Sequence, residues 1–185
     1  MTTFNKRPTR LSKLLILLMT IVGLTLPSCQ PAKRSEFALY LLAQDIPATQ
    51  LSQLEIDQWR LQANPILSSD DIVVYDKANH TLELTPDAYA RIQQIFPMPV
   101  KVDGIPFVVC VGKERIYLGA FWTPLSSLSY DGIVIMQPLD NSQTTIQLSL
   151  GYPAPEVFSG NDLRSDPRII NALEQSGKLL VKKEE

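Results

Sequence analysis

The chain has 185 residues, of which 45% are hydrophobic and 19% charged, and its formal net charge is −2 at pH 7. This composition is typical of a packed globular protein. It lacks the excess of lysine and arginine that phosphate recognition requires, so we expect no nucleic-acid partner.

The first 28 residues have the pattern of an export signal. Four cations and no acid precede an apolar run from Leu14 to Leu26. That run is about 13 residues long, whereas about 20 are needed to cross a hydrocarbon core about 30 Å thick. A signal peptide over residues 1–28 is therefore a better interpretation than a transmembrane helix.

The signal ends in Leu26-Pro27-Ser28-Cys29. This tetrapeptide resembles the lipobox of bacterial lipoproteins, in which a branched residue lies three places before an invariant cysteine and a small residue directly before it. The resemblance implies cleavage after Ser28 and a diacylglyceryl group on the Cys29 thiol, which would bind the protein to a membrane. Two or three acyl chains make such attachment durable, since each buried methylene contributes about 0.8 kcal/mol. A plain signal peptide with a chance cysteine is the alternative.

The resemblance also implies a location on the exported side of the cell envelope. Family sorting rules treat aspartate after the cysteine as an inner-membrane signal, so Gln30 slightly favours the outer membrane where two membranes exist. Cleavage would remove four cations and no acid, which leaves 157 residues with 13 basic and 19 acidic side chains, a net charge of −6. Residues 29–35 then form a short lipidated tether, and residues 36–185 a single domain.

The domain begins with a predicted strand at residues 37–42. Pro47 opens a predicted helix that continues through Leu51, Leu54 and Ile56. Residues 71–75 and 80–84 predict a hairpin around a turn at 76–79.

Thr85 and Pro86 predict the N-cap and first position of a helix that Pro97 and Pro99 stop. The apolar face of this helix comprises Ala88, Ile92, Ile95 and Phe96. A second hairpin joins strands at 105–111 and 116–121 through the turn 112–114.

Residues 124–130 predict a loop or short helix. A third hairpin follows, with strands at 133–136 and 145–150 around a turn at 140–141. Residues 151–166, rich in proline and glycine, are the longest candidate irregular loop. The last helix is capped by Asp166, starts at Pro167 and stops at Gly177. Its inner face comprises Ile169, Ile170 and Leu173.

This order of elements predicts an α+β fold, with a mainly antiparallel sheet built from hairpins and two or three packing helices. If Cys29 is lipidated, Cys110 is the one remaining thiol, and no disulfide framework can form. Cys110 lies in an apolar strand, so we interpret it as a small buried hydrophobe rather than a nucleophile.

The sequence offers few groups for catalysis or metal binding. His80 is the only histidine, and neither a Gly-x-Ser-x-Gly nor a Ser-x-x-Lys motif is present. Asp70, Asp71 and Asp76 lie near His80, but their spacing matches no calcium loop. Acids at strand ends usually cap turns or face solvent. We therefore expect no metal site and no cofactor, and we interpret His80 as a structural or exposed strand histidine.

A stretch of aromatic and hydroxyl residues at the exit of the second hairpin is the candidate binding loop. It comprises Tyr117, Phe121, Trp122, Thr123, Ser126, Tyr130 and Asp131. The alternative is structural: Phe121, Trp122 and Leu125 plug one end of the core while Thr123 caps a short helical turn.

Several segments together resemble an uncharacterised family of bacterial exported lipoproteins. They are Asp71-Ile72, Tyr75-Asp76, Leu84-Thr85 with Ala88, Pro106 to Val109, and Ile116 to Trp122. The resemblance covers most of the mature domain and implies no assigned activity. A shorter stretch, Leu82 to Gly112, is similar to the periplasmic region of the SecD translocase subunit, which implies at most a related α/β substructure.

These observations favour a non-catalytic binding or accessory lipoprotein that acts on a protein partner or another envelope component. One alternative is an enzyme that uses the carboxylates of Asp71, Asp131 or Glu114, two of which would have to converge in a pocket. Another is a small-molecule carrier whose apolar strands enclose a cavity.

Overall fold

The computed structural model describes residues 36–52, 55–96, 98–139 and 143–180. The predicted signal peptide, the tether and Cys29 lie outside these residues. Within the described part of the chain, no helix has the length and hydropathy that a membrane span requires.

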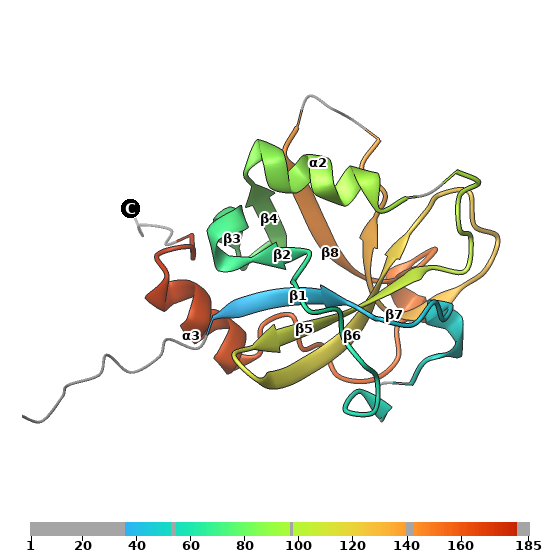
Figure 1. Cartoon of the computed structure of the whole chain (residues 1–185), viewed down its shortest axis with the longest axis horizontal. Helices are drawn as coiled ribbons and strands as arrows, with labels where there is room; N and C mark the ends of the chain where they lie inside the picture. The colour runs from blue at the N-terminus through green and yellow to red at the C-terminus, as the bar shows by residue number, and fades with distance from the viewer. Residues whose placement is uncertain (1–35, 53–54, 97, 140–142, 181–185) are drawn as a thin grey trace, which may run out of the picture. The chain divides into compact units, whose positions relative to one another are not determined.

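A single curled sheet dominates the fold (Figure 1). Its strands follow the order β2-β1-β5-β6-β7-β8-β4-β3. In chain order they are β1 (Phe37–Leu41), β2 (Leu67–Ser68), β3 (Ile72–Asp76), β4 (Thr81–Leu84), β5 (Ile105–Val111), β6 (Glu114–Trp122), β7 (Tyr130–Met136) and β8 (Thr145–Tyr152).

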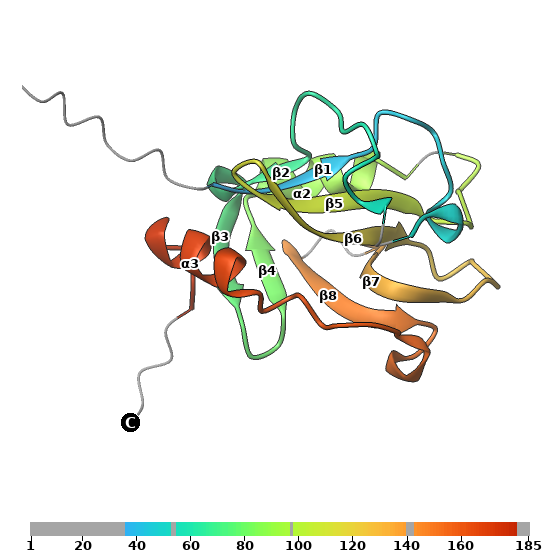
Figure 2. The ribbon, with the colours of Figure 1, turned by 90° about the horizontal axis from the view of Figure 1, so that it is seen from below.

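The sheet curls because its two edge strands are neighbours in the chain. Only the short 3-10 helix η3 (Ser69–Asp71) separates β2 from β3. Figure 2 shows the result: β1, β5 and β6 form one side, β7 and β8 the other, and β3 and β4 lie between them at one end. The outer edge of β3 is covered by the C-terminal segment, since the Tyr75 N–H donates to the Lys178 carbonyl at 2.6 Å.

The α+β prediction is confirmed. Each of the three predicted hairpins pairs in antiparallel fashion, as β3 with β4, β5 with β6 and β7 with β8. The turn of the third hairpin, residues 140–142, lies outside the described residues. One pair departs from the predicted pattern, because β6 and β7 are parallel, with Gly119 opposite Ile133. The connecting residues 123–129 carry the chain back along β6 before β7 begins.

The helices α2 (Pro86–Gln94) and α3 (Pro167–Gln175) begin where their capping residues predicted. The Thr85 hydroxyl accepts from the Ala88 N–H at 3.3 Å, and the Asp166 carboxylate accepts from the Arg168 N–H at 2.9 Å. Gly177, with φ of 70°, follows the end of α3. Both helices pack their predicted apolar faces against the sheet.

The predicted helix from Pro47 to Ile56 is wrong. Among the described residues of this segment, the 3-10 helix η1 (Ala48–Gln50) forms, Leu51 is already extended, and no α-helix is present. Leu54 lies outside the described residues. Leu51 and Ile56 instead pack with Trp59 against the outer face of the sheet. Tertiary contacts thus override a weak helical period.

The irregular segment after β8 is shorter than predicted. β8 extends to Tyr152, and the 3-10 helix η4 (Pro155–Val157) follows it. Residues 124–129, in contrast, form a loop, which is one of the two predicted outcomes.

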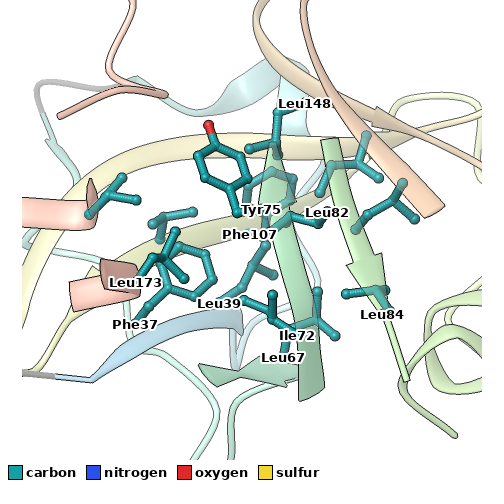
Figure 3. Close-up of a cluster of buried hydrophobic side chains, with 14 of the residues drawn as sticks. Phe37, Leu39, Leu67, Ile72, Tyr75, Leu82, Leu84, Phe107, Leu148 and Leu173 are labelled. Atoms are coloured by element: carbon teal, nitrogen blue, oxygen red, sulfur yellow. The ribbon is translucent and has the colours of Figure 1, made fainter. Parts of the chain in front are cut away.

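The core lies inside the curl of the sheet (Figure 3), where Leu39, Phe107 and Leu148 come together from three strands and Leu173 from α3. These side chains are almost inaccessible to solvent. Buried apolar side chains from the sheet and from α3 therefore make up the core inside the curl. Cys110 is buried on the outer face, and burial raises the pKa of its thiol, so its interpretation as a small buried hydrophobe is confirmed.

Candidate functional site

An open cavity of about 440 Å³ lies where β7 begins beside β6. Its walls come from Tyr117 and Leu118 of β6, residues 130–133 of β7, and residues 158–161 and Leu163 of the segment after η4. Leu51 and Ser52 complete it. This volume falls within the range of about 300–1,000 Å³ that small-ligand sites occupy.

The parallel pairing of β6 and β7 explains the position of the cavity. β7 is paired with β6 only from Ile133 onward, and its register with β8 shifts between Tyr130 and Ile133. The first residues of β7 therefore diverge from β6. Gly132 permits this path, because a Cβ at that position would lie 2.6 Å from the ring of Tyr130.

Asp131 and Ser159 fix one wall of the cavity. The Ser159 hydroxyl donates to Asp131 Oδ2 at 2.8 Å, and the Ser159 N–H donates to the Asp131 carbonyl at 2.9 Å. Asp131 is exposed, and it is the one charged residue among the described residues that line the cavity. The carboxylate keeps Oδ1 for further interactions.

Tyr117 lines the cavity and also belongs to the buried core. Its side chain is 2% exposed, and its Oη has no hydrogen-bond partner among the described residues. Burial is the main cause that raises the pKa of this phenol far above its ordinary value; the nearby Tyr75 raises it further, and Arg164 opposes the shift. Tyr117 therefore stays neutral and can both donate and accept a hydrogen bond.

Tyr130 is held in place by stacking. Its ring lies 5.3 Å from that of Trp122, centroid to centroid, at an interplanar angle of 21°. Tyr152 contacts the same Trp122 ring at 5.7 Å. Burial raises the pKa of Tyr130, so this phenol also remains neutral. Two aromatic contacts of Trp122 therefore position the Tyr130 ring at the β7 wall of the cavity.

The structure divides the predicted binding loop into two groups. Tyr117, Tyr130 and Asp131 line the cavity, whereas Trp122 lies behind it as the support of Tyr130. Phe121 belongs to the core and packs edge-on against Phe96.

The two hydroxyl residues of that loop have structural roles. The Thr123 hydroxyl donates to Gln137 Oε1 at 3.0 Å and accepts from the Leu125 N–H, while the Ser126 hydroxyl donates to the Val102 carbonyl at 2.5 Å. Phe121 and Trp122 are buried, as the structural alternative expects, whereas the hydroxyl of Thr123 bonds within a turn and caps no helix. The structural alternative is wrong for Leu125, which is 71% exposed.

Sequence reasoning missed Leu51, Ser52 and the segment 158–163 as parts of the site. The only available signal for the segment was the length of the irregular stretch before α3, since long loops often carry binding residues.

The three acids of the carboxylate alternative lie in three separate environments. The Asp71 carboxylate accepts from the N–H of Ser68, the N-cap residue of η3, and pairs with Arg91 at 2.6 Å. Burial alone would raise its pKa, but the hydrogen bonds from Arg91 and Ser68 outweigh burial and lower it. Glu114 pairs with Arg168 on α3 at 3.2 Å, and Asp131 binds Ser159.

His80 lies in the β3–β4 turn with φ of 52°. Its Nδ1 is 2.9 Å from the Tyr75 hydroxyl, and burial is the main cause that lowers its pKa. Among the described residues, no three His, Cys, Asp or Glu side chains are arranged to hold a metal ion.

No protein-family model, curated protein or solved structure matches this chain.

Proposed function

We propose that this protein is a lipoprotein anchored through Cys29 on the exported side of the cell envelope, where its domain binds a protein or another envelope component without catalysis. The observation that carries the proposal is the cationic and apolar leader that ends in Leu26-Pro27-Ser28-Cys29. Gln30 at the next position favours the outer membrane where two membranes exist.

The position of the first strand supports an anchored domain. β1 begins at Phe37, so seven residues separate it from Cys29. Such a tether spans at most about 25–30 Å when fully extended. The start of β1 would then remain within that distance of the membrane surface.

The chemistry of that cavity favours binding over catalysis. The Ser159 hydroxyl donates to the exposed carboxylate of Asp131, and the described lining residues include no histidine, lysine or second acid that would complete a catalytic group. Hydroxyl, amide and apolar groups remain, and these orient a ligand rather than transform it.

The test is a Cys29→Ala substitution in cells grown with radiolabelled palmitate. We expect the label and the membrane association of the protein to disappear together, while Cys110→Ala, the matched control at the other cysteine, keeps both. Label that persists in Cys29→Ala would contradict the proposed attachment. Membrane association that persists without label would indicate an uncleaved signal segment or another anchor.

A further inference from the structure

We infer that the domain contacts the lipid bilayer at a second place, through an exposed apolar surface at the end of the domain opposite the start of β1. This surface, called the apolar tip below, comprises Met98, Val102, Leu125 and Leu128. The inference rests on the proposed function, because the lipid on Cys29 is what brings the domain to a membrane. It adds a contact and an orientation that the lipid alone does not specify.

The side chains of the apolar tip are far more exposed than apolar side chains usually are. Their exposed fractions are 87% for Met98, 71% for Leu125, and 44% for both Val102 and Leu128. Single exposed apolar residues are common, but a cluster of them marks a surface that binds protein or membrane. These four come from two loops, residues 98–104 and 123–129, and the Ser126 hydroxyl joins the loops by donating to the Val102 carbonyl at 2.5 Å.

The second loop buries its hydroxyl groups and exposes its leucines, the reverse of a usual surface loop. Thr123 and Ser126 are 1% and 7% exposed. Their hydroxyls hold the backbone, because Thr123 Oγ1 accepts from the Leu125 N–H at 3.3 Å and Ser126 Oγ from the Leu128 N–H at 3.1 Å. The Tyr152 hydroxyl donates to the Ser126 carbonyl at 3.3 Å. Leucines that the loop holds outward in this way suit apolar surroundings.

The shape of the apolar tip favours a bilayer over a folded partner. A cavity at this end is lined by Asp45, Lys101 and Gly104 among others, but by none of the four side chains of the tip. A stable protein interface buries about 800 Å² on each partner. Four side chains, two of them less than half exposed, supply much less than that. Fluid lipid, in contrast, can surround single apolar side chains that project from a surface.

Charge contributes little to this contact. Residues 123–129 contain no charged side chain. In the first loop, Lys101 pairs with Asp45, and Asp103 is the other ionisable residue. The apolar tip therefore has no net positive charge that would attract anionic headgroups. Burial of apolar surface must drive the contact, so we expect it to be insensitive to salt.

The apolar tip and the start of β1 lie at opposite ends of β1, β5 and β6. Phe37, the first residue of β1, pairs with Val111, the last residue of β5. The loops of the tip instead precede Ile105 and follow Trp122, at the other end of β5 and β6. In Figures 1 and 2, β1 begins beside α3 and these loops lie at the far end of the domain. Contacts at both ends would hold the length of β1 along the membrane surface.

A tryptophan placed in the apolar tip tests the inference. We would reconstitute the full chain in phosphatidylcholine vesicles with and without brominated acyl chains, which quench tryptophan at short range, and subtract the signal of the parent chain. Leu125→Trp should lose most of its added fluorescence in brominated lipid. The matched control is Leu139→Trp, which should keep its fluorescence. Leu139 is 72% exposed but lines a different cavity, together with Tyr89 of α2.

A charge introduced into the apolar tip should reverse the quenching. Val102→Asp, combined with Leu125→Trp, should abolish it, because an ionised carboxylate resists transfer from water into lipid. Val73→Asp is the matched control, since Val73 lies on β3 and is 47% exposed, close to the 44% of Val102. The same charge at Val73 should leave the quenching of Leu125→Trp unchanged.

Four outcomes would overturn the inference: Leu125→Trp is not quenched, it is quenched no more than Leu139→Trp, its quenching is lost at high salt, or Val102→Asp leaves the quenching intact. Absence of quenching would indicate that a protein partner or a second copy covers the tip instead. Palmitate labelling of Cys29 does not depend on the tip. Labelled protein without quenching would therefore overturn this inference alone, whereas quenching without label would overturn the proposed anchor alone.

Discussion

At the scale of single residues, two buried tyrosines differ in one respect that can be measured. The Tyr75 hydroxyl lies 2.9 Å from His80 Nδ1 and donates to the Arg164 carbonyl at 3.1 Å, whereas the Tyr117 hydroxyl has no partner in the part of the chain that the structure describes. We therefore expect Tyr75→Phe to lower the free energy of unfolding by about 1 kcal/mol or more, and Tyr117→Phe to raise it by about 1 kcal/mol. Urea denaturation of the two variants beside the parent chain checks this.

The pair is its own control, because both substitutions remove one oxygen from a side chain that is 1–2% exposed. Equal destabilisation by both substitutions would show that Tyr117 Oη is satisfied, for example by a bound water molecule. The Tyr117 hydroxyl would then be a structural group.

At the scale of elements, the cap of α3 makes stability depend on pH. Hydrogen bonds from the Arg168 side chain are the main cause that lowers the pKa of Asp166, burial opposes them, and the Arg168 N–H adds to the lowering. Because the pKa of Asp166 is lower in the folded state, its ionised carboxylate stabilises the fold at pH values above its pKa in the unfolded chain, near 4. This stabilisation is lost as the pH falls through the pKa of Asp166 in the folded state.

Substitutions at Asp166 separate the cap from the charge. Asp166→Ala should cost about 0.5–2 kcal/mol at pH 7, whereas Asp166→Asn keeps the cap and should lose less. The difference between the parent chain and Asp166→Asn should shrink as the pH of the unfolding measurement falls below about 4. A difference that stays constant from pH 7 to pH 3 would show that the Asp166–Arg168 pair contributes nothing to stability.

The same elements show what sequence reasoning can reach. Capping residues and turns are local signals, so the starts of α2 and α3 and all three hairpins were predictable. The helix predicted after Pro47 is wrong because long-range contacts decide the structure of that segment. Leu51 and Trp59 pack on the sheet instead. Long-range pairing carries no comparable signal: nothing near β7 indicates that it lies parallel to β6.

The candidate site follows the same division. Tyr117, Tyr130 and Asp131 stand out as aromatic and acidic residues beside strands, and all three line the cavity. Residues 158–163 have no periodicity, and only the completed fold brings them to β7. Sequence reasoning could therefore reach one wall of the site but not the other.

At the scale of the whole molecule, the linkage of β2 to β3 through η3 joins the two edges of the sheet. If residues 36–185 are one domain, as predicted, the sheet should unfold in one step together with the outer segment, which is the stretch that packs Leu51, Ile56 and Trp59 on the outer face of the sheet. The two tryptophans report on different parts of this assembly. Trp59 packs on the outer face near Leu42 and Cys110, while Trp122 stacks on Tyr130 behind the cavity.

Single-tryptophan chains, Trp59→Phe and Trp122→Phe, should each show a fluorescence transition that coincides with its own far-ultraviolet circular dichroism transition in urea. Both chains will be less stable than the parent, so the comparison is made between two probes within each variant. If the Trp59 signal, measured in Trp122→Phe, changes at lower urea than the circular dichroism, the outer segment opens separately. Leu51 and Ser52 of the outer segment also line the cavity. Such opening would therefore make access to the cavity depend on the outer segment as well as on β7.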